Sequence, residues 1–213
     1  MENTVIKVTG RGRIKLPPDV AIFSISLNGT SDDYASAIAS ASERASALNA
    51  ALVDHGFEKG VAKTTGVNVS PRYDYPNGER RFAGFGYAHD LTMTLPSDNA
   101  TLSRALTALS RTEATFSFSY GLSDPERARE KLLADAVRDA RSKAEALAGA
   151  AGVVLGDMIA IEHSAPAAAL RGRTFASACN AEGGTVRAEF DPDDVSATDE
   201  VTISWSIAGR VRK

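Results

Sequence analysis

This chain has few of the sequence features that assign a protein to a class, such as cysteines, long apolar runs or an excess of one charge. It has one cysteine in 213 residues, so no disulfide can form within it and the fold must depend on its core. No apolar run approaches the roughly 18 residues that span a bilayer. The 24 lysines and arginines nearly balance the 27 aspartates and glutamates, giving a net charge of −3. This balance argues against a basic face for a nucleic acid, and the short apolar runs argue against membrane insertion.

The first residues lack the features of a secretory signal. Met1 to Lys7 contain no basic start, apolar stretch or small-residue cleavage site, and they lead directly into a strand pattern. We therefore expect a cytoplasmic protein for the chain as given, and a periplasmic or extracellular one if its N-terminus has been trimmed.

The composition is that of an ordinary globular protein. The chain is 43% hydrophobic and 24% charged, which supplies enough apolar surface to offset chain entropy. One unit of this length can bury about 70% of the surface that its unfolded chain exposes. No composition shift or repeat marks a boundary, so we expect a single domain over residues 1–213.

Alternating apolar and polar residues predict strands, because successive side chains of a strand point to opposite faces. The predicted strands cover residues 5–9, 20–27, 61–72, 82–95, 115–120, 152–161 and 201–207. Asn77-Gly78 predicts a hairpin with a projecting tip between the third and fourth of them.

Apolar residues at steps of three and four predict helices over residues 30–55, 97–110 and 123–150. We expect Thr30 or Ser31 to cap the first helix and Gly56 to end it in a left-handed conformation. The third helix should expose Asp139 and Lys143 on its outer side. Its predicted buried stripe is Ala128, Leu132, Ala136, Ala140, Leu147 and Ala151.

The order of these segments predicts an α+β fold, with a mixed, largely antiparallel sheet and long helices packed on one face. Residues 163–194 follow no pattern and are rich in alanine and glycine. We expect a long loop there, either functional or mobile.

Four local patterns, taken in order, resemble the SIMPL-domain family from about residue 5 to 211. They are Val8-Thr-Gly-Arg-Gly12 followed by Pro18-Asp-Val-Ala21, Lys63 to Tyr73 with its Thr, Pro and Tyr, Ala140 to Ala148 ending at Gly152, and Phe190 to Val195 before the last strand. No single pattern is diagnostic, and their order and spacing carry the resemblance.

The resemblance implies a SIMPL-like fold and little chemistry. Members of that family are typically bacterial and often periplasmic, and they include an oxidative-stress defence protein and an immunogenic protein that forms ring-like homo-oligomers. The resemblance thus implies a homo-oligomer and a part in the stress response. It supplies no catalytic residues, and this sequence departs from the family in lacking a signal peptide.

The residues that could carry chemistry are scattered. His55, His89 and His163 have no partner at i+3 or i+4, so a metal site would have to assemble across the fold with Cys179. We interpret His55 as a helix-terminal residue and His89 as a core histidine with satisfied hydrogen bonds. Cys179 is interpreted as an incidental thiol, although Arg171 and Arg173 would lower its pKa if they lay close.

Two glycine pairs and an acidic cluster also have simple interpretations. Gly10-Arg-Gly12 and Gly84-Phe-Gly86 lead into no helix, so we predict bulges or bends in place of a phosphate cradle. The aspartates around Pro192 lack calcium-loop spacing and are predicted to form a turn. We therefore expect no metal, no cofactor and no catalytic residue. An enzyme would require the fold to bring His89 or His163 within hydrogen-bond reach of a nucleophile or a carboxylate.

Two regions have the composition of a protein interface, which is enriched in arginine and aromatic residues. The hairpin tip carries Arg72, Tyr73, Tyr75, Arg80, Arg81 and Phe82, and the long loop carries Arg171, Arg173 and Phe175. The main hypothesis is a non-catalytic module that self-associates or binds another protein, with open strand edges as further pairing sites. The alternative is a small-molecule-binding protein with a pocket between helices and sheet.

Overall fold

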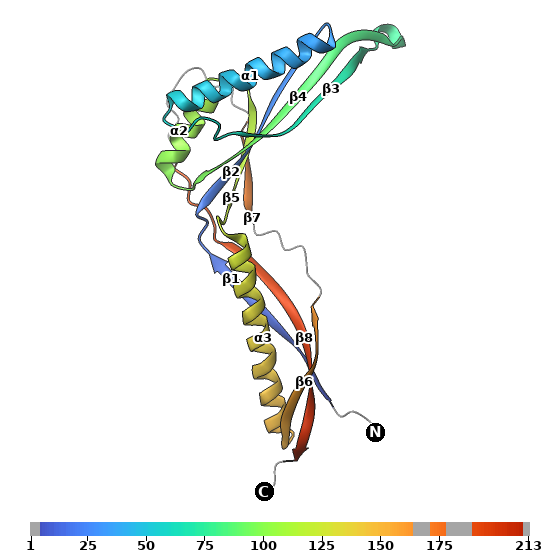
Figure 1. Ribbon diagram of the computed structural model, residues 1–213, viewed down its shortest axis with the longest axis vertical. Helices are drawn as coiled ribbons and strands as arrows, with labels where there is room; N and C mark the ends of the chain where they lie inside the picture. The colour runs from blue at the N-terminus through green and yellow to red at the C-terminus, as the bar shows by residue number, and fades with distance from the viewer. Residues whose placement is uncertain (1–4, 164–170, 178–188, 211–213) are drawn as a thin grey trace. The chain divides into compact units, whose positions relative to one another are not determined.

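The structure is a computed structural model that describes residues 5–163, 171–177 and 189–210, with only the backbone described for 171–177 (Figure 1). Its elements are β1 (Val5–Leu16), β2 (Val20–Ser31), α1 (Tyr34–Asp54), β3 (Lys63–Asp74), the 3-10 turn η1 (Pro76–Gly78), β4 (Arg81–Pro96), α2 (Asn99–Leu109), β5 (Thr115–Gly121), α3 (Pro125–Ala150), β6 (Val153–His163), β7 (Arg171–Ser177) and β8 (Val195–Arg210). The α+β class is confirmed, with the strands divided between two sheets.

The chain folds as two compact units. Unit 1 takes residues 1–17, 122–171 and 194–213, and unit 2 takes residues 18–121 and 172–193. The assignment of residues 1–213 to a single domain stays a prediction.

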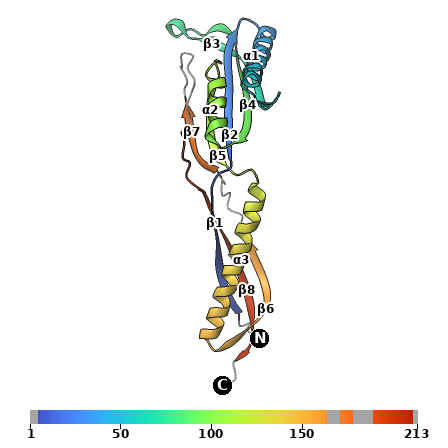
Figure 2. The same ribbon diagram turned by 90° about the vertical axis from the view of Figure 1, so that its left-hand side faces the viewer.

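Unit 1 is a three-stranded sheet with one long helix along it (Figure 2). The strand order is β1-β8-β6, and β8 pairs antiparallel with both neighbours. The inward residues Val201, Ile203 and Trp205 of β8 pack against Ala136 and Ala140 of α3. Because α3 presents small alanines, its backbone can lie close to the sheet.

Gly10 and Gly12 lie within β1, and the bulge predicted for them is wrong. Their register with β8 is continuous, and Gly10 stands opposite Val201. A Cβ on Gly10 would lie 2.1 Å from the carbonyl oxygen of Ala136, and one on Gly12 would lie 1.9 Å from that of Leu132. The two glycines therefore allow the backbone of α3 to contact β1.

The buried stripe of α3 differs from the prediction at its C-terminal end. Ala144 and Ala148 are buried, whereas Leu147 is 51% exposed and Ala151 is exposed. The buried residues continue at a constant step of four from Ala128. Such a row runs obliquely round a helix, and a twisted sheet stays in contact with it.

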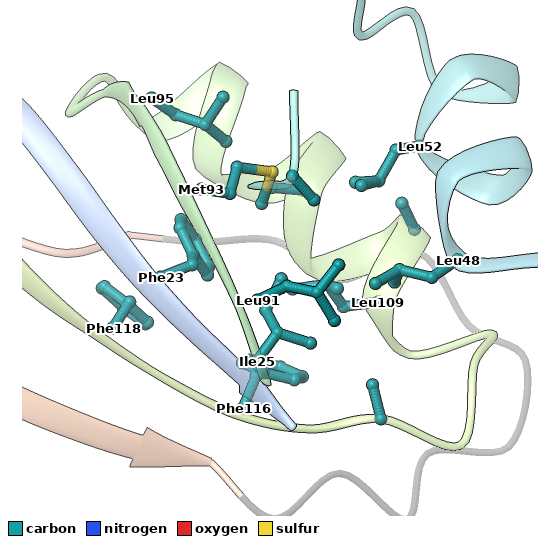
Figure 3. Close-up of a cluster of buried hydrophobic side chains, with 14 of the residues drawn as sticks. Phe23, Ile25, Leu48, Leu52, Leu91, Met93, Leu95, Leu109, Phe116 and Phe118 are labelled. Atoms are coloured by element: carbon teal, nitrogen blue, oxygen red, sulfur yellow. The ribbon is translucent and has the colours of Figure 1, made fainter. Parts of the chain in front are cut away.

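Unit 2 is a five-stranded sheet of order β3-β4-β2-β5-β7. α1 and α2 cover the apolar face of this sheet, and Figure 3 shows Leu48 and Leu52 pointing from α1 toward the residues of the strands. The rings of Phe23 and Phe118 stack at 5.1 Å within this core. The aromatic face predicted for residues 115–120 is thus confirmed.

The ends of α1 match the prediction in part. Gly56 has a φ of 81°, as expected for the residue that ends the helix. The cap is Asp33, whose carboxylate accepts a hydrogen bond from the backbone N–H of Ser36, and not Thr30 or Ser31. Both predicted caps lie in or beside β2, which extends to Ser31.

The β3–β4 hairpin is confirmed at Asn77-Gly78, where both residues have positive φ values of 57° and 83°. Gly84, with a φ of 93°, lies in a register shift of β4. A bulge at the second glycine pair is therefore confirmed.

The predicted loop 163–194 also contains a strand, since residues 171–177 form β7. In the described part of the chain, no helix has the length and apolar character that a bilayer crossing requires.

Candidate functional site

The structure brings three of the predicted hairpin residues together. Tyr73 and Phe82 stand directly opposite each other on β3 and β4, with ring centroids 5.9 Å apart in an edge-on arrangement. The guanidinium of Arg80 lies 3.7 Å from the centroid of the Tyr73 ring, which is a cation–π contact.

Two residues that sequence reasoning did not assign to this surface extend it. The Phe82 ring lies 5.5 Å from that of Phe85, and the Phe85 ring lies 5.9 Å from that of Tyr34 at the start of α1. We call Tyr73, Phe82, Phe85 and Tyr34 the aromatic row. Tyr73 is 36% exposed, Phe82 52% and Tyr34 56%.

The other predicted hairpin residues lie nearby without joining the row. The methylene groups of Arg72 lie over Gly86. Arg81 stands opposite Asp74 and lines a hollow of about 580 Å³ together with Phe82. Tyr75 is 64% exposed.

The predicted residues of the long loop are described only in part. The backbones of Arg171, Arg173 and Phe175 belong to β7, beside β5. Cys179 lies outside the described residues.

Two side chains of α3 bond to backbone groups in the middle of β1. The carboxylate of Asp139 accepts a hydrogen bond from the backbone N–H of Arg11 at 2.7 Å, and Lys143 donates to the carbonyl of Thr9 at 3.1 Å. Lys143 and Asp139 also pair at 2.6 Å. Hydrogen bonds from Lys143 and Arg11 hold the pKa of Asp139 below its ordinary value. Lys143 is exposed as predicted and Asp139 is half-buried, and both side chains also bond to the middle of the β1 edge.

The opposite edge of the same sheet has a different surface. β6 exposes four large apolar side chains, each between 46% and 53%, namely Val154, Met158, Ile159 and Ile161. Among the edges predicted to pair between subunits, β6 fits that role better than β1.

His55 and His89 have the structural roles predicted for them. His55 ends α1, and its Nδ1 lies 2.8 Å from the carbonyl oxygen of Ala51. His89 is 7% exposed, with Nε2 at 2.8 Å from the Thr64 hydroxyl and Nδ1 at 3.3 Å from the Ala41 carbonyl. Both ring nitrogens of this core histidine therefore have partners.

His163 lies beside a carboxylate, since its Nε2 is 3.0 Å from an oxygen of Asp199. An enzyme is expected to need His89 or His163 within hydrogen-bond reach of a nucleophile or a carboxylate. Two pairs meet this condition, His163 with Asp199 and His89 with Thr64. None of these four residues lines any of the three cavities described in this section. No group of metal-ligating side chains forms within the described residues. The non-catalytic assignment stays a prediction.

Unit 2 contains a cavity of about 550 Å³ between α1, the end of β2 and the turn before β5. We call it the α1 cavity. It is lined by Leu27, Gly29, Thr30, Ser40, Glu43, Arg44, Ala47, Leu48, Ala51, Tyr87, Arg111, Thr112 and Glu113. Its volume lies in the range of small-molecule pockets. A further hollow of about 630 Å³, rich in serine and threonine, lies on β2, β4 and β5.

Arg44 is fixed at the α1 cavity by two contacts. Its Nη1 donates to the carbonyl of Asn28 at 2.7 Å, and its Nη2 pairs with the carboxylate of Glu113. A guanidinium has five N–H donors, so these contacts leave donors for a ligand.

Comparison with known proteins places the chain among relatives without an assigned activity. The pattern described as "SIMPL: Protein of unknown function (DUF541)" matches residues 6–205. An uncharacterized protein YggE of Edwardsiella ictaluri is 25% identical over 166 residues, which are 76% of this chain and 69% of that protein. A 26 kDa periplasmic immunogenic protein of Brucella melitensis biotype 1 is 27% identical over 169 residues, 74% of this chain and 66% of that protein.

Proposed function

Because this chain belongs to the SIMPL family, whose description assigns no activity, we propose from its geometry that it is a non-catalytic module that binds protein, with self-association as the first case. The observation that carries the proposal is the aromatic row on unit 2.

The aromatic row has the chemistry of an interaction hot spot. Three of its four members are exposed by a third or more, although each could bury a large apolar area. Exposed large side chains that adjoin one another mark contact sites more often than isolated ones do. Arginine and tyrosine also dominate the binding energy of measured interfaces, and Arg80 lies on the Tyr73 ring.

The row is also held in place before any partner arrives. Tyr73 and Phe82 are opposite residues of paired strands, and the Gly84 bulge lies between Phe82 and Phe85 on β4. Edge-on ring contacts fix each side chain against the next. A preformed surface loses less side-chain entropy on binding, which supports affinity.

The cellular location and the physiological role are proposed from the relatives. The Brucella relative is named as periplasmic, and we propose that location for this protein if a signal segment precedes the sequence given. A stress-related role is proposed from the family resemblance.

Self-association is tested with the purified chain by size-exclusion chromatography with light scattering over a range of concentrations. We expect a mass above that of the 22.4 kDa monomer at high micromolar concentration. Phe82→Ser removes the central exposed ring of the row, and we expect it to weaken association about tenfold or more.

Val67→Ser is the matched control, because Val67 is 50% exposed on the same hairpin and lies outside the row. It should leave the mass unchanged. A clean monomer at every concentration would count against self-association. If Val67→Ser and Phe82→Ser weaken association equally, the aromatic row is not the contact site.

A further inference from the structure

One hydroxyl group at the α1 cavity has no hydrogen-bond partner among the described residues. Tyr87 is 5% exposed and lines the cavity, yet its hydroxyl makes no hydrogen bond within the described residues. It stands opposite Gly29, where a Cβ would lie 2.4 Å from the hydroxyl oxygen. Gly29 makes room for this hydroxyl, which remains accessible and can bond to a ligand.

The charges that line the cavity are of both signs. Arg44 and Glu113 neutralise each other. Glu43 and Arg111 are exposed and take part in no ion pair in the described part of the chain. The cavity therefore offers a ligand one unpaired carboxylate and one unpaired guanidinium, together with the remaining donors of Arg44.

The rest of the lining is mainly small and apolar. Leu27 and Leu48 are almost fully buried, so the accessible apolar surface comes from Ala47 and Ala51 of α1. An apolar wall with a few convergent polar groups is the usual composition of a site for a small organic molecule.

We propose that the α1 cavity binds a small zwitterion that joins a carboxylate and an ammonium group to an apolar body, the chemistry of a free α-amino acid. The ligand carboxylate pairs with Arg111 and accepts from Arg44 and the Tyr87 hydroxyl, and the ammonium pairs with Glu43. The apolar body packs on Ala47 and Ala51. This site does not depend on the aromatic row.

The ligand class is tested by titration calorimetry of the whole chain with the standard L-amino acids, starting from L-leucine and L-phenylalanine. We expect saturable binding of at least one apolar amino acid. N-acetyl-leucine lacks the ammonium and leucinamide lacks the carboxylate, so each should bind at least about tenfold more weakly than leucine.

Three substitutions connect that binding to the cavity. Tyr87→Phe should weaken binding about tenfold while leaving the Tm unchanged or higher, because it removes a hydroxyl without a partner. Glu43→Gln should weaken leucine binding but not N-acetyl-leucine binding. Arg111→Gln should weaken leucine binding but not leucinamide binding.

The matched controls are Glu58→Gln and Arg127→Gln, which change exposed charges outside the cavity lining. They should not change the affinity, and neither should Phe82→Ser. Absence of saturable binding for every amino acid at millimolar concentration overturns the proposal. Equal affinity for leucine and a blocked derivative, or unchanged affinity in Tyr87→Phe, overturns it as well.

Discussion

Two glycines set the distance between α3 and β1. The nearest atoms to a Cβ at Gly10 or Gly12 belong to the helix backbone, which cannot move away as a flexible side chain can. Gly149 of α3 has no such neighbour, because a Cβ there meets nothing within 4 Å. The cost of adding one methyl group therefore depends on what faces it.

We expect Gly12→Ala to destabilise unit 1 by about 3 kcal/mol, the upper end of the range for overpacking. Gly149→Ala is the matched control and should stabilise α3 by about 0.5 kcal/mol, since alanine favours a helix over glycine. Urea unfolding followed by Trp205 fluorescence measures both. Similar midpoints for the two variants would show that α3 can shift away from β1.

At the scale of elements, side chains of α3 occupy the middle of one edge of the sheet. Asp139 and Lys143 satisfy a backbone N–H and a carbonyl of β1 that another strand would otherwise contact. An edge whose polar groups are already bonded is a poor template for a further strand. The apolar residues of β6 make that edge the better candidate for pairing.

The Asp139 contact makes stability depend on pH. Its pKa in the folded chain lies below the ordinary value of 3.8, so the contact stabilises the fold above about pH 4. The stabilisation is lost as the pH falls through the folded pKa. We expect Asp139→Asn to cost about 1 kcal/mol at pH 7, since the pair is partly exposed and screened by solvent.

The difference between Asp139→Asn and the unchanged protein should shrink as the pH falls from about 4 through the lowered pKa of Asp139. Denaturant midpoints at several pH values measure it. Asp135→Asn is the control on the same helix, because Asp135 makes an i,i+3 pair with Arg138. It should change stability by about 0.5 kcal/mol at most.

The sequence predicts elements well where a local period is strong. The alternation in β5 and the stripe of α1 from Ala41 to Leu52 both come from neighbours in the chain, so pattern alone finds them. The same pattern places Tyr34 and Ile38 in the stripe, and both are exposed. Strand partners are different, because β1 pairs with β8 from the far end of the sequence. The unpatterned segment hid β7, whose few residues lie among alanine and glycine.

The candidate site divides in the same way. Tyr73 and Phe82 flank a recognisable turn, so the sequence predicts that they lie near each other. Tyr34 joins them only through Phe85, next to the bulge at Gly84. The α1 cavity has no local signal, since Arg44 and Glu113 meet from distant parts of the chain.

At the scale of the whole molecule, each unit has its own core and its own optical reporter. Trp205 is the one tryptophan and lies buried in unit 1, while all five tyrosines lie between Pro18 and Gly121 in unit 2. Tryptophan and tyrosine signals therefore follow different parts of the chain.

We expect the two signals to change at different denaturant concentrations, because separate cores can unfold in separate steps. Tryptophan fluorescence and tyrosine absorbance recorded in one titration test this. Gly12→Ala should move the tryptophan transition more than the tyrosine transition. If the tryptophan and tyrosine transitions coincide in the unchanged protein and in Gly12→Ala, the chain unfolds as a single cooperative domain.

The position of β8 in the sheet bears on how the protein is made. β8 is the central strand of unit 1, and it is synthesised after β1, α3 and β6. Those elements cannot complete their sheet on the ribosome until residues 195–210 emerge, whereas β2 to β5, α1 and α2 of unit 2 come from one continuous stretch. Unit 2 can thus form most of its core during translation, while β1 waits for a partner strand that is made after the other elements of unit 1.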